Sequence, residues 1–356
     1  MVTADGGGRS RLFRELNREG DSLVTPAKIV DVYRGPLVES SHYGHIAVVD
    51  LQGNILHSVG DPQRLTFARS SAKPLQAIPV VESGAADRYQ FSPADIALCC
   101  ASHSGEAQHV NRAAAMLSRI GLSPDALQCG THIPHDQEGY KQLIRAGGEL
   151  TPLYNNCSGK HSGMLALACH MGADPAGYRQ VDHPVQVAMR AAVADLAGMK
   201  PEEIVIGVDG CGVPVFGLPL YRLALAFAKL SDPSDLPEAR RQAVERITSA
   251  MMAHPEMVAG TNRFCTDLMG ALRGRVIGKA GAEGVYAAGI MGKGIGIAVK
   301  VEDGNIRAAY PAVVAVLEQL GCLNETDLQA LQHHRVPVIK NARQEVIGQL
   351  RAAFSL

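Results

Sequence analysis

Runs of apolar and β-branched residues lie near both ends of the chain and predict strands there. In the N-terminal part, one run covers residues 27–38 and a second covers residues 45–59. The Gln-Gly-Asn tripeptide at 52–54 interrupts the second run with the composition of a hairpin turn. We therefore expect a β-meander near the N-terminus, followed by a helix that begins beside Ser70.

Strand patterns return in the C-terminal part, at residues 275–279, 284–290 and 294–301. The Glu-Asp-Gly-Asn segment at 302–305 follows the last of them and predicts another hairpin. A helical pattern then covers residues 310–320, and the glycine that follows it is typical of a helix end.

The middle of the chain, residues 92–235, has mainly helical periodicity. The clearest helical patterns there and just beyond are at 108–120, 159–171, 184–196 and 237–253. Strands at both ends with helices between them predict an α/β (α+β) fold. We expect one antiparallel sheet built from the N- and C-terminal segments, with flanking helices and a central helical insertion.

This arrangement predicts one folded unit rather than two separate domains, because both ends of the chain contribute to the same sheet. We assign residues 25–356 to that unit. The sheet part is expected at about 25–80 and 260–356, and the mainly helical part at about 81–259. Residues 1–24 are polar and rich in Gly and Arg, so we expect a flexible tail there.

Composition and charge exclude several functional classes. The 34 Lys and Arg residues are balanced by 35 Asp and Glu residues, which leaves no basic surface for nucleic acid or for an anionic membrane. The sequence contains no run of 18 apolar residues, so it predicts no membrane span. The N-terminal residues lack the apolar segment of a secretory signal, and the eight cysteines are scattered. These features predict a reduced, cytoplasmic protein.

A hydroxyl and an amine lie one helical turn apart in the segment RSSAKP at 69–74. Ser70 and Lys73 are three residues apart and share a helix face, whereas Ser71 does not face Lys73. Pro74 is tolerated only in the first turn of a helix, which places Ser70 at or beside the N-cap. Two interpretations remain: Ser70 caps the helix, or it is a nucleophile whose proton a neutral Lys73 accepts.

Two other polar positions are candidates for the same chemistry. Ser102 lies in the loop ASHSGE at 101–106, a setting common for active-site residues, although a turn serine bonded to its own backbone is the alternative. We expect His103 in this loop to support the site rather than to act as a base. Lys279 lies on a predicted strand in VIGKAG, which is similar to the K-T-G strand motif of serine β-lactamases. The alternative is an exposed strand lysine.

The cysteines fall into two groups. Cys157 and Lys160 repeat the spacing of Ser70 and Lys73 at the start of a predicted helix. Two thiolates with one nitrogen suit zinc, although the C-x-x-C pairs of a conventional structural zinc site are absent. Cys211 lies between two glycines after Asp209, where a close backbone approach is possible, so we do not assign it to the apolar core. Asp209 is placed to orient a lysine ammonium or to hold a substrate amine. We expect the following cysteines to be apolar core residues: Cys99, Cys100, Cys129, Cys169 and Cys322.

Five segments taken in order carry a resemblance to a known family. They are RSSAKP at 69–74, ASHSGE at 101–106, NNCSGKHSGM at 155–164, DGCGVP at 209–214 and TNRFC at 261–265. Over roughly residues 25–352, the chain resembles the thermolabile, rhizobial-type (class 3) L-asparaginases.

The resemblance implies a fold similar to serine β-lactamases and glutaminases, a homodimer, and hydrolysis of L-asparagine to L-aspartate and ammonia. It implies that Ser70 is the nucleophile of an acyl-enzyme, with Lys73 as its partner. Ser102 and Lys279 match a second Ser–Lys pair in the same site. The alternatives are a glutaminase or another serine acyl hydrolase on the same scaffold, or a zinc–thiolate binding protein.

The resemblance also implies a Zn²⁺ ion near the two Ser–Lys pairs, held through two cysteines and a lysine. Cys157, Lys160 and Cys265 match these three ligands. The ion is expected to organise the site or the substrate rather than to activate the nucleophile. Asp209 and Cys211 match further residues of the site.

Overall fold

The computed structural model describes residues 25–356, and the tail predicted at residues 1–24 lies outside the described residues. The strands are β1 (Ala27–Arg34), β2 (Leu37–Val49), β3 (Ile55–Val59), β4 (Leu65–Phe67), β5 (Val205–Val208), β6 (Pro214–Pro219), β7 (Val276–Ala280), β8 (Val285–Ile290), β9 (Ile295–Val301), β10 (Val338–Lys340) and β11 (Val346–Ala352).

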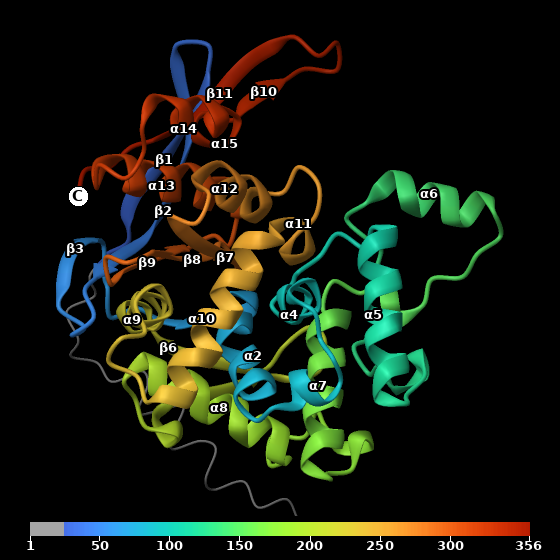
Figure 1. Ribbon diagram of the computed structural model, residues 1–356. Coiled ribbons are helices and arrows are strands. Elements are labelled where there is room, and N and C mark those ends of the chain that lie inside the picture. The colour runs from blue at the N-terminus through green and yellow to red at the C-terminus, as the bar shows by residue number, and fades with distance from the viewer. Residues whose placement is uncertain (1–24) are drawn as a thin grey trace, which may run out of the picture.

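The helices follow the same numbering (Figure 1). They are the 3₁₀ turn η1 (Arg69–Ala72), α2 (Lys73–Glu82), α3 (Ala85–Arg88), α4 (Pro93–Cys99), α5 (Ala107–Ile120), α6 (Gln137–Arg145), α7 (Ser158–Met171), α8 (Pro184–Ala197), α9 (Leu220–Ser231), α10 (Glu238–Ala253), α11 (Pro255–Val258), α12 (Phe264–Leu272), α13 (Ile306–Gln319), α14 (Glu325–Ala330) and α15 (Gln332–Arg335).

The main sheet confirms the predicted fold class. Its strand order is β10-β11-β1-β2-β9-β8-β7, with β3 paired to β2, and its neighbouring strands are antiparallel. The N-terminal strands β1 and β2 lie between the C-terminal strands β11 and β9, so both ends of the chain build one sheet. The helices of the middle of the chain lie below this sheet in Figure 1.

Helices cover both sides of the sheet. α9 packs against β2, β8 and β9, and α13 packs against β1, β8, β9 and β11; Figure 1 shows them on opposite sides of β8 and β9. Gly289 and Gly296 face each other across β8 and β9. A Cβ atom at either position would collide with backbone oxygens of α9. The two glycines therefore allow α9 to lie close against the sheet.

The centre of the helical part is α2, whose residues from Lys73 to Val81 are all buried. It packs against α4, α7, α8 and α10, which surround it in Figure 1. A helix that is covered on all sides belongs to the interior of a domain. α2 therefore holds its N-terminal residues, including Lys73, at a fixed place between the sheet and the other helices.

Most predicted helices agree with the structure to within a few residues, but one predicted turn and the extent of one predicted strand are wrong. The segment at 302–305 is not a hairpin turn: Asn305 caps α13, and its side chain accepts a hydrogen bond from the N–H of Arg307. The strand predicted at 27–38 is interrupted at Gly35, where φ is 55° and the chain turns from β1 into β2. The small sheet β4-β6-β5 was not predicted from the pattern.

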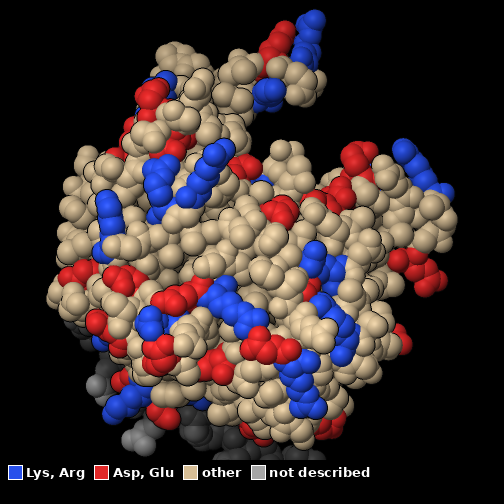
Figure 2. Space-filling view, in the orientation of Figure 1, with Lys and Arg blue, Asp and Glu red and all other residues tan. Residues whose placement is uncertain are grey.

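The surface carries both signs of charge. Figure 2 shows acidic and basic side chains interspersed over the face that it draws, in agreement with the formal net charge of −1. Within residues 25–356, no helix combines the length and the apolar character needed to cross a membrane.

Candidate active site

Lys73 lies at the first position of α2 and is almost completely buried, with 1% of its surface exposed. Its Nζ donates hydrogen bonds to the backbone oxygen of Ala101 at 2.5 Å and to the Oγ of Ser102 at 3.0 Å. It also lies 3.1 Å from the Sγ of Cys157. Lys73 therefore connects two residues that are distant in sequence, and the nearest hydroxyl to its amine is that of Ser102.

Ser102 lies in the loop that follows α4, and its backbone N–H donates to the oxygen of Val258 at 2.9 Å. Its Oγ lies between two lysines, 3.0 Å from the Nζ of Lys73 and 2.9 Å from the Nζ of Lys279. A serine that only stabilises its own turn would bond to nearby backbone instead. The contacts of Ser102 with two lysines therefore argue against its alternative interpretation as a turn serine bonded to its own backbone.

Lys279 lies on β7 and is as deeply buried as Lys73, so the alternative of an exposed strand lysine is wrong. Besides Ser102, its Nζ donates to the backbone oxygen of Ala280 at 2.8 Å. Burial lowers the pKa of Lys279 to about 7, helped by the nearby cations of Lys73 and Arg263 and opposed by Cys265. A lysine with this pKa is present in both charge states near neutral pH and can accept a proton there.

Ser70 lies inside the 3₁₀ turn η1, so its interpretation as a helix cap is wrong. The N-cap residues are Ala68 for η1 and Ala72 for α2. Within the described part of the chain, no side chain or backbone group hydrogen-bonds to the Ser70 hydroxyl, and the residue is half-buried. The neighbouring Ser71 is buried and donates to the oxygen of Ala68 at 2.6 Å. Of the two serines, Ser70 is the one with a free hydroxyl.

A close approach brings the end of β7 to the turn that contains Ser70. Gly281 follows β7, and a Cβ atom at this position would collide with the backbone oxygen of Ala68. The adjacent Arg69 has a φ of 50°, a conformation that side-chain-bearing residues rarely adopt. The strand that carries Lys279 and the turn that carries Ser70 are therefore packed directly against each other.

A group of thiols adjoins the lysines. Cys157 precedes α7 and Lys160 lies in its first turn, where the amine donates to the Sγ of Cys211 at 3.1 Å. The neighbouring Cys211 thiol, together with the cations of Lys73 and Lys160, lowers the pKa of Cys157 well below its ordinary value. The same interaction with Cys157 raises the pKa of Cys211. Cys157 is therefore the thiolate of this pair.

The pKa of Lys160 is shifted in the opposite direction from that of Lys279. Burial alone lowers the pKa of Lys160, but its interactions with Cys211, with the Cys157 thiolate and with the Asp209 carboxylate outweigh burial and raise its pKa above the ordinary value. The three side chains of Cys157, Lys160 and Cys211 form one connected group of two soft sulfur donors and one nitrogen. This donor set fits zinc, provided that Lys160 loses its proton on binding.

Cys265 lies apart from this group on α12. Its Sγ accepts a hydrogen bond from the N–H of Ala280 at 3.2 Å. Its interactions raise the pKa of both Lys279 and Tyr286, which places it on the Lys279 side of the site. The structure thus places Cys211, rather than the Cys265 expected as a ligand, beside Lys160.

Asp209 is oriented by an arginine that the sequence analysis did not single out. Its Oδ1 accepts a hydrogen bond from the Nε of Arg69 at 2.9 Å. Burial raises the pKa of Asp209, but the positive charges of Lys160 and Arg69 more than offset this and leave the pKa below its ordinary value. Asp209 is therefore ionised and paired with Arg69. Arg69 directly precedes Ser70, so its guanidinium is the cation closest in sequence to the free hydroxyl.

His103 is buried between the Ser102 loop and the start of α7. The ring is fully buried, its Nδ1 accepts from the N–H of Gly105 at 3.1 Å, and its Nε2 therefore carries the proton that it donates to the Oγ of Ser158 at 2.9 Å. Burial, and then the charges of His109 and Lys73, lower the pKa of His103 well below its ordinary value. His103 is thus a neutral ring that connects the Ser102 loop to the start of α7.

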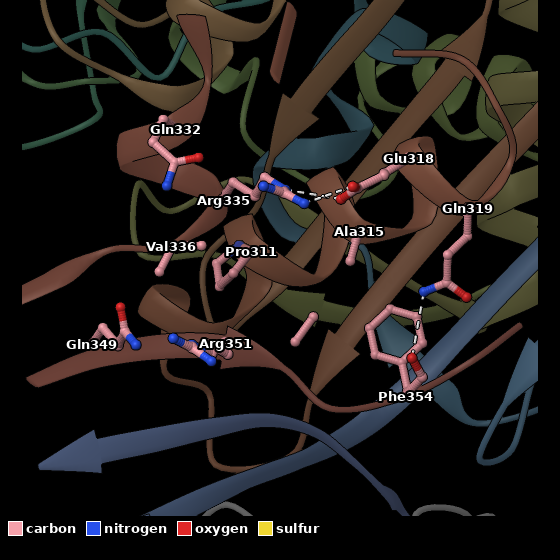
Figure 3. A pocket seen from close by; sticks show the side chains of 11 residues that line it. Pro311, Ala315, Glu318, Gln319, Gln332, Arg335, Val336, Gln349, Arg351 and Phe354 are labelled. Atoms are coloured by element: carbon pink, nitrogen blue, oxygen red, sulfur yellow. Dashed lines mark hydrogen bonds and ion pairs between the residues drawn. The ribbon is translucent and has the colours of Figure 1, made fainter. Parts of the chain in front are cut away.

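Two surface cavities lie away from this buried cluster. One of about 510 Å³ is lined by residues of α13, α15 and the C-terminal strand, including the Arg335–Glu318 ion pair (Figure 3). The other, of about 730 Å³, borders the loop after Asp209 through Gly212 and Pro214. None of the predicted site residues lines either cavity.

Comparison with known proteins gives a match over most of the chain. A family model described as L-asparaginase II matches residues 30–352. No curated protein sequence matches the chain. Among solved structures, the chain is similar to one titled Mglu in its native form, with 14% identity and a TM-score of 0.43 over 91% of this chain and 71% of that chain.

Two β-lactamase structures are also similar to the chain. One is a protein from Bacteroides dorei titled a putative β-lactamase, with 12% identity and a TM-score of 0.40 over 77% of this chain and 93% of that chain. The other is a β-lactamase from Mycobacterium bovis, with 14% identity and a TM-score of 0.40 over 79% of this chain and 95% of that chain.

Proposed function

The chain belongs to the L-asparaginase II family, and from this premise we propose that it hydrolyses L-asparagine to L-aspartate and ammonia through a serine acyl-enzyme. The observation that supports this proposal most strongly is the buried Lys73–Ser102–Lys279 cluster beside the free hydroxyl of Ser70. A serine is a weak nucleophile until a neighbouring base takes its proton. Two lysines joined by a hydroxyl, one of them with a pKa of about 7, supply such a base.

In the proposed first step, the Ser70 oxygen attacks the carbon of the side-chain amide. Lys73 passes a proton through the Ser102 hydroxyl to the neutral amine of Lys279, and it takes up the hydroxyl proton of Ser70 in exchange. The continuous helical segment η1–α2 begins beside Ser70 and offers the positive end of its dipole to the developing oxyanion. The amide nitrogen then takes up a proton and leaves as ammonia. Water attacks the resulting ester, releases L-aspartate and restores the Ser70 hydroxyl.

We assign the two serines different tasks because their surroundings differ. The oxygen of Ser102 already interacts with two amines, which holds it in place and suits it to relay protons between them. Both serines are half-buried, but the hydroxyl of Ser70 has no such partner in the described part of the chain. A nucleophile has to be free to approach the substrate, so Ser70 is the better candidate.

Substrate binding is assigned to the group beside Ser70. A guanidinium binds a carboxylate in a planar, two-pronged geometry, so Arg69 is proposed to hold a carboxylate of asparagine. Asp209 fixes the orientation of that guanidinium through the 2.9 Å hydrogen bond. This role for Asp209 is proposed beside the two considered from the sequence, in which it orients a lysine or holds the substrate amine.

Zinc is proposed to bind at Cys157, Lys160 and Cys211, with Cys211 in the place first expected for Cys265. Bound there, zinc would supply a fixed positive charge that orders the loop after Asp209. We also propose, from the resemblance, that the protein is a cytoplasmic homodimer. Sedimentation at several protein concentrations tests the dimer, because a monomer at all of them would contradict it.

Ammonia release by the purified protein, measured with asparagine and with glutamine as separate substrates, tests the proposed function. We expect a higher kcat/KM with asparagine. A higher value with glutamine would instead identify a glutaminase, and hydrolysis of a β-lactam without ammonia release would identify a β-lactam hydrolase. If no substrate is turned over with or without added zinc, the zinc–thiolate binding protein becomes the favoured alternative.

A further inference from the structure

A second group of possible metal ligands lies outside the active site. Asp267 on α12 and the adjacent residues His333 and His334 on α15 bring one ligand atom each to within 4.8 Å of one another. The Nε2 atoms of His333 and His334 lie 3.3 Å and 2.7 Å from the same carboxylate oxygen, Oδ2 of Asp267. Consecutive residues of a helix normally point in different directions. Here both imidazoles converge on one point.

The positions of the two histidines are fixed by neighbouring side chains. The ring of His334 packs against the ring of Phe264 at a centroid distance of 4.8 Å and lies 6.0 Å from that of Tyr310. The turn that carries both histidines is anchored by Arg335, whose guanidinium makes two hydrogen bonds of 2.9 Å and 2.6 Å to Glu318 on α13. Figure 3 shows this pair at the cavity beside α15. These contacts therefore hold His333 and His334 in place on α15.

We propose that Asp267, His333 and His334 bind a divalent transition-metal ion, independently of the active site. Two ligands that bind one ion at about 2.1 Å, at an angle of about 90–110°, lie about 3.0–3.4 Å apart. The two nitrogen–oxygen distances of 2.7 Å and 3.3 Å are close to this range. The carboxylate oxygen is therefore already at a suitable distance from each imidazole nitrogen, and all three ligand atoms lie within 4.8 Å of one another.

The donor set selects the class of ion. Two imidazoles and one carboxylate suit zinc, nickel, cobalt or copper, whereas magnesium and calcium prefer oxygen ligands. The side chain of His333 is 61% exposed, so the remaining coordination positions are open to water. An ion here joins segments that lie 66 and 67 residues apart in the chain. It would fasten the C-terminal part to α12, which packs against the strand that carries Lys279.

The test is a count of bound metal in the purified full chain. The protein is stripped with a chelator and dialysed against a series of Ni²⁺ concentrations, and bound nickel is measured by mass spectrometry. We expect the wild-type protein to bind one equivalent per chain more than His333→Gln and Asp267→Asn do. In each variant, affinity for that equivalent is expected to fall by about 10–100-fold, the scale of losses at metal sites.

His254→Gln is the matched control, since His254 is also a partly exposed histidine beside a carboxylate, that of Glu256, at 3.4 Å. It should bind as much nickel as the wild type. Any nickel on the Cys157, Lys160 and Cys211 group is common to all four proteins and cancels in the comparison. His333 is exposed, so its variant should keep the wild-type circular dichroism spectrum. Equal nickel binding by the wild type and both site variants would overturn the proposal.

Discussion

Lys279 and Lys160 are both fully buried, yet their pKa values move in opposite directions. Burial lowers the pKa of each. Around Lys279 the cations of Lys73 and Arg263 add to burial, and the pKa falls to about 7. Around Lys160 the interactions with Cys211, with the Cys157 thiolate and with the Asp209 carboxylate reverse the effect. The comparison teaches that the partners, more than the depth of burial, decide whether a buried lysine serves as a base or as a fixed cation.

We expect the largest effect on activity from the proposed nucleophile, Ser70, which belongs to the Lys279 side of the site. Ser70→Ala removes the proposed nucleophile, and the kcat for ammonia release is expected to fall by at least about 10⁴-fold, on the scale seen when a catalytic serine is removed. The fold should be unaffected, because the hydroxyl is half-buried and makes no hydrogen bond within residues 25–356. The readout is ammonia release beside a circular dichroism spectrum.

Ser71→Ala is the control for Ser70→Ala, because the Ser71 hydroxyl bonds only to the backbone oxygen of Ala68. It should keep its activity and lose about 1 kcal/mol of unfolding free energy, the usual net contribution of one hydrogen bond. If Ser70→Ala retained near-normal activity, Ser70 would not be the nucleophile.

The next largest effect is expected at the hydroxyl that joins the two amines. Ser102→Ala removes the oxygen that lies 3.0 Å from Lys73 and 2.9 Å from Lys279. Proton transfer between them is then interrupted, and kcat should fall by about 10²–10⁴-fold, as for the loss of a general acid–base. Ammonia release at saturating asparagine measures this. A change confined to KM would show that Ser102 acts in binding and not in proton transfer.

The charge state of Lys279 should be visible in the pH dependence of activity. Because its pKa is about 7, Lys279 is protonated below that pH and cannot accept a proton. The kcat/KM is therefore expected to rise through about pH 7 and to fall about tenfold for each pH unit below it. Lys73 and Lys279 interact, so the apparent pKa describes the pair. A rate maximum near pH 6 would rule out a lysine base.

Around Lys160, the cysteine variants are expected to differ in zinc content rather than in the acyl-transfer reaction itself. Cys211→Ser should lower the zinc bound by the purified enzyme, because Cys211 lies beside Lys160 and Cys157. Cys265→Ser should keep its zinc, since its contact is with the N–H of Ala280. Zinc analysis of both variants decides between the two cysteines. Loss of zinc in Cys265→Ser alone would restore the ligand set first implied by the resemblance.

Much of the fold could be predicted from local pattern. The strand-rich ends and the helical middle were readable because amphipathic periodicity and turn composition are local properties. The turn at 302–305 was misread because Asp, Gly and Asn suit a hairpin and a helix N-terminus equally well. The strands of the small sheet β4-β6-β5 were missed because they have only three to six residues and depend on long-range pairing for their stability.

The site was predictable only in part, because its contacts are formed by packing. The spacing of Ser70 and Lys73 predicted that the two residues share the start of one helical segment, but the hydrogen bonds of the Lys73 amine go to Ala101 and Ser102 and not to Ser70. It could not show that the Lys73 amine contacts Ser102, 29 residues away, or that Lys279 reaches the same oxygen from 177 residues away. The left-handed backbone of Arg69, which accompanies its contact with Asp209, likewise has no local signal in the sequence.

Identification of the residue that carries the acyl group tests the central claim most directly. The enzyme is quenched with acid while it turns over L-asparagine, and its peptides are analysed by mass spectrometry. The account predicts an aspartyl ester on the peptide that contains Ser70, and no ester in Ser70→Ala. An ester on the Ser102 peptide, or a thioester on Cys157, would contradict it.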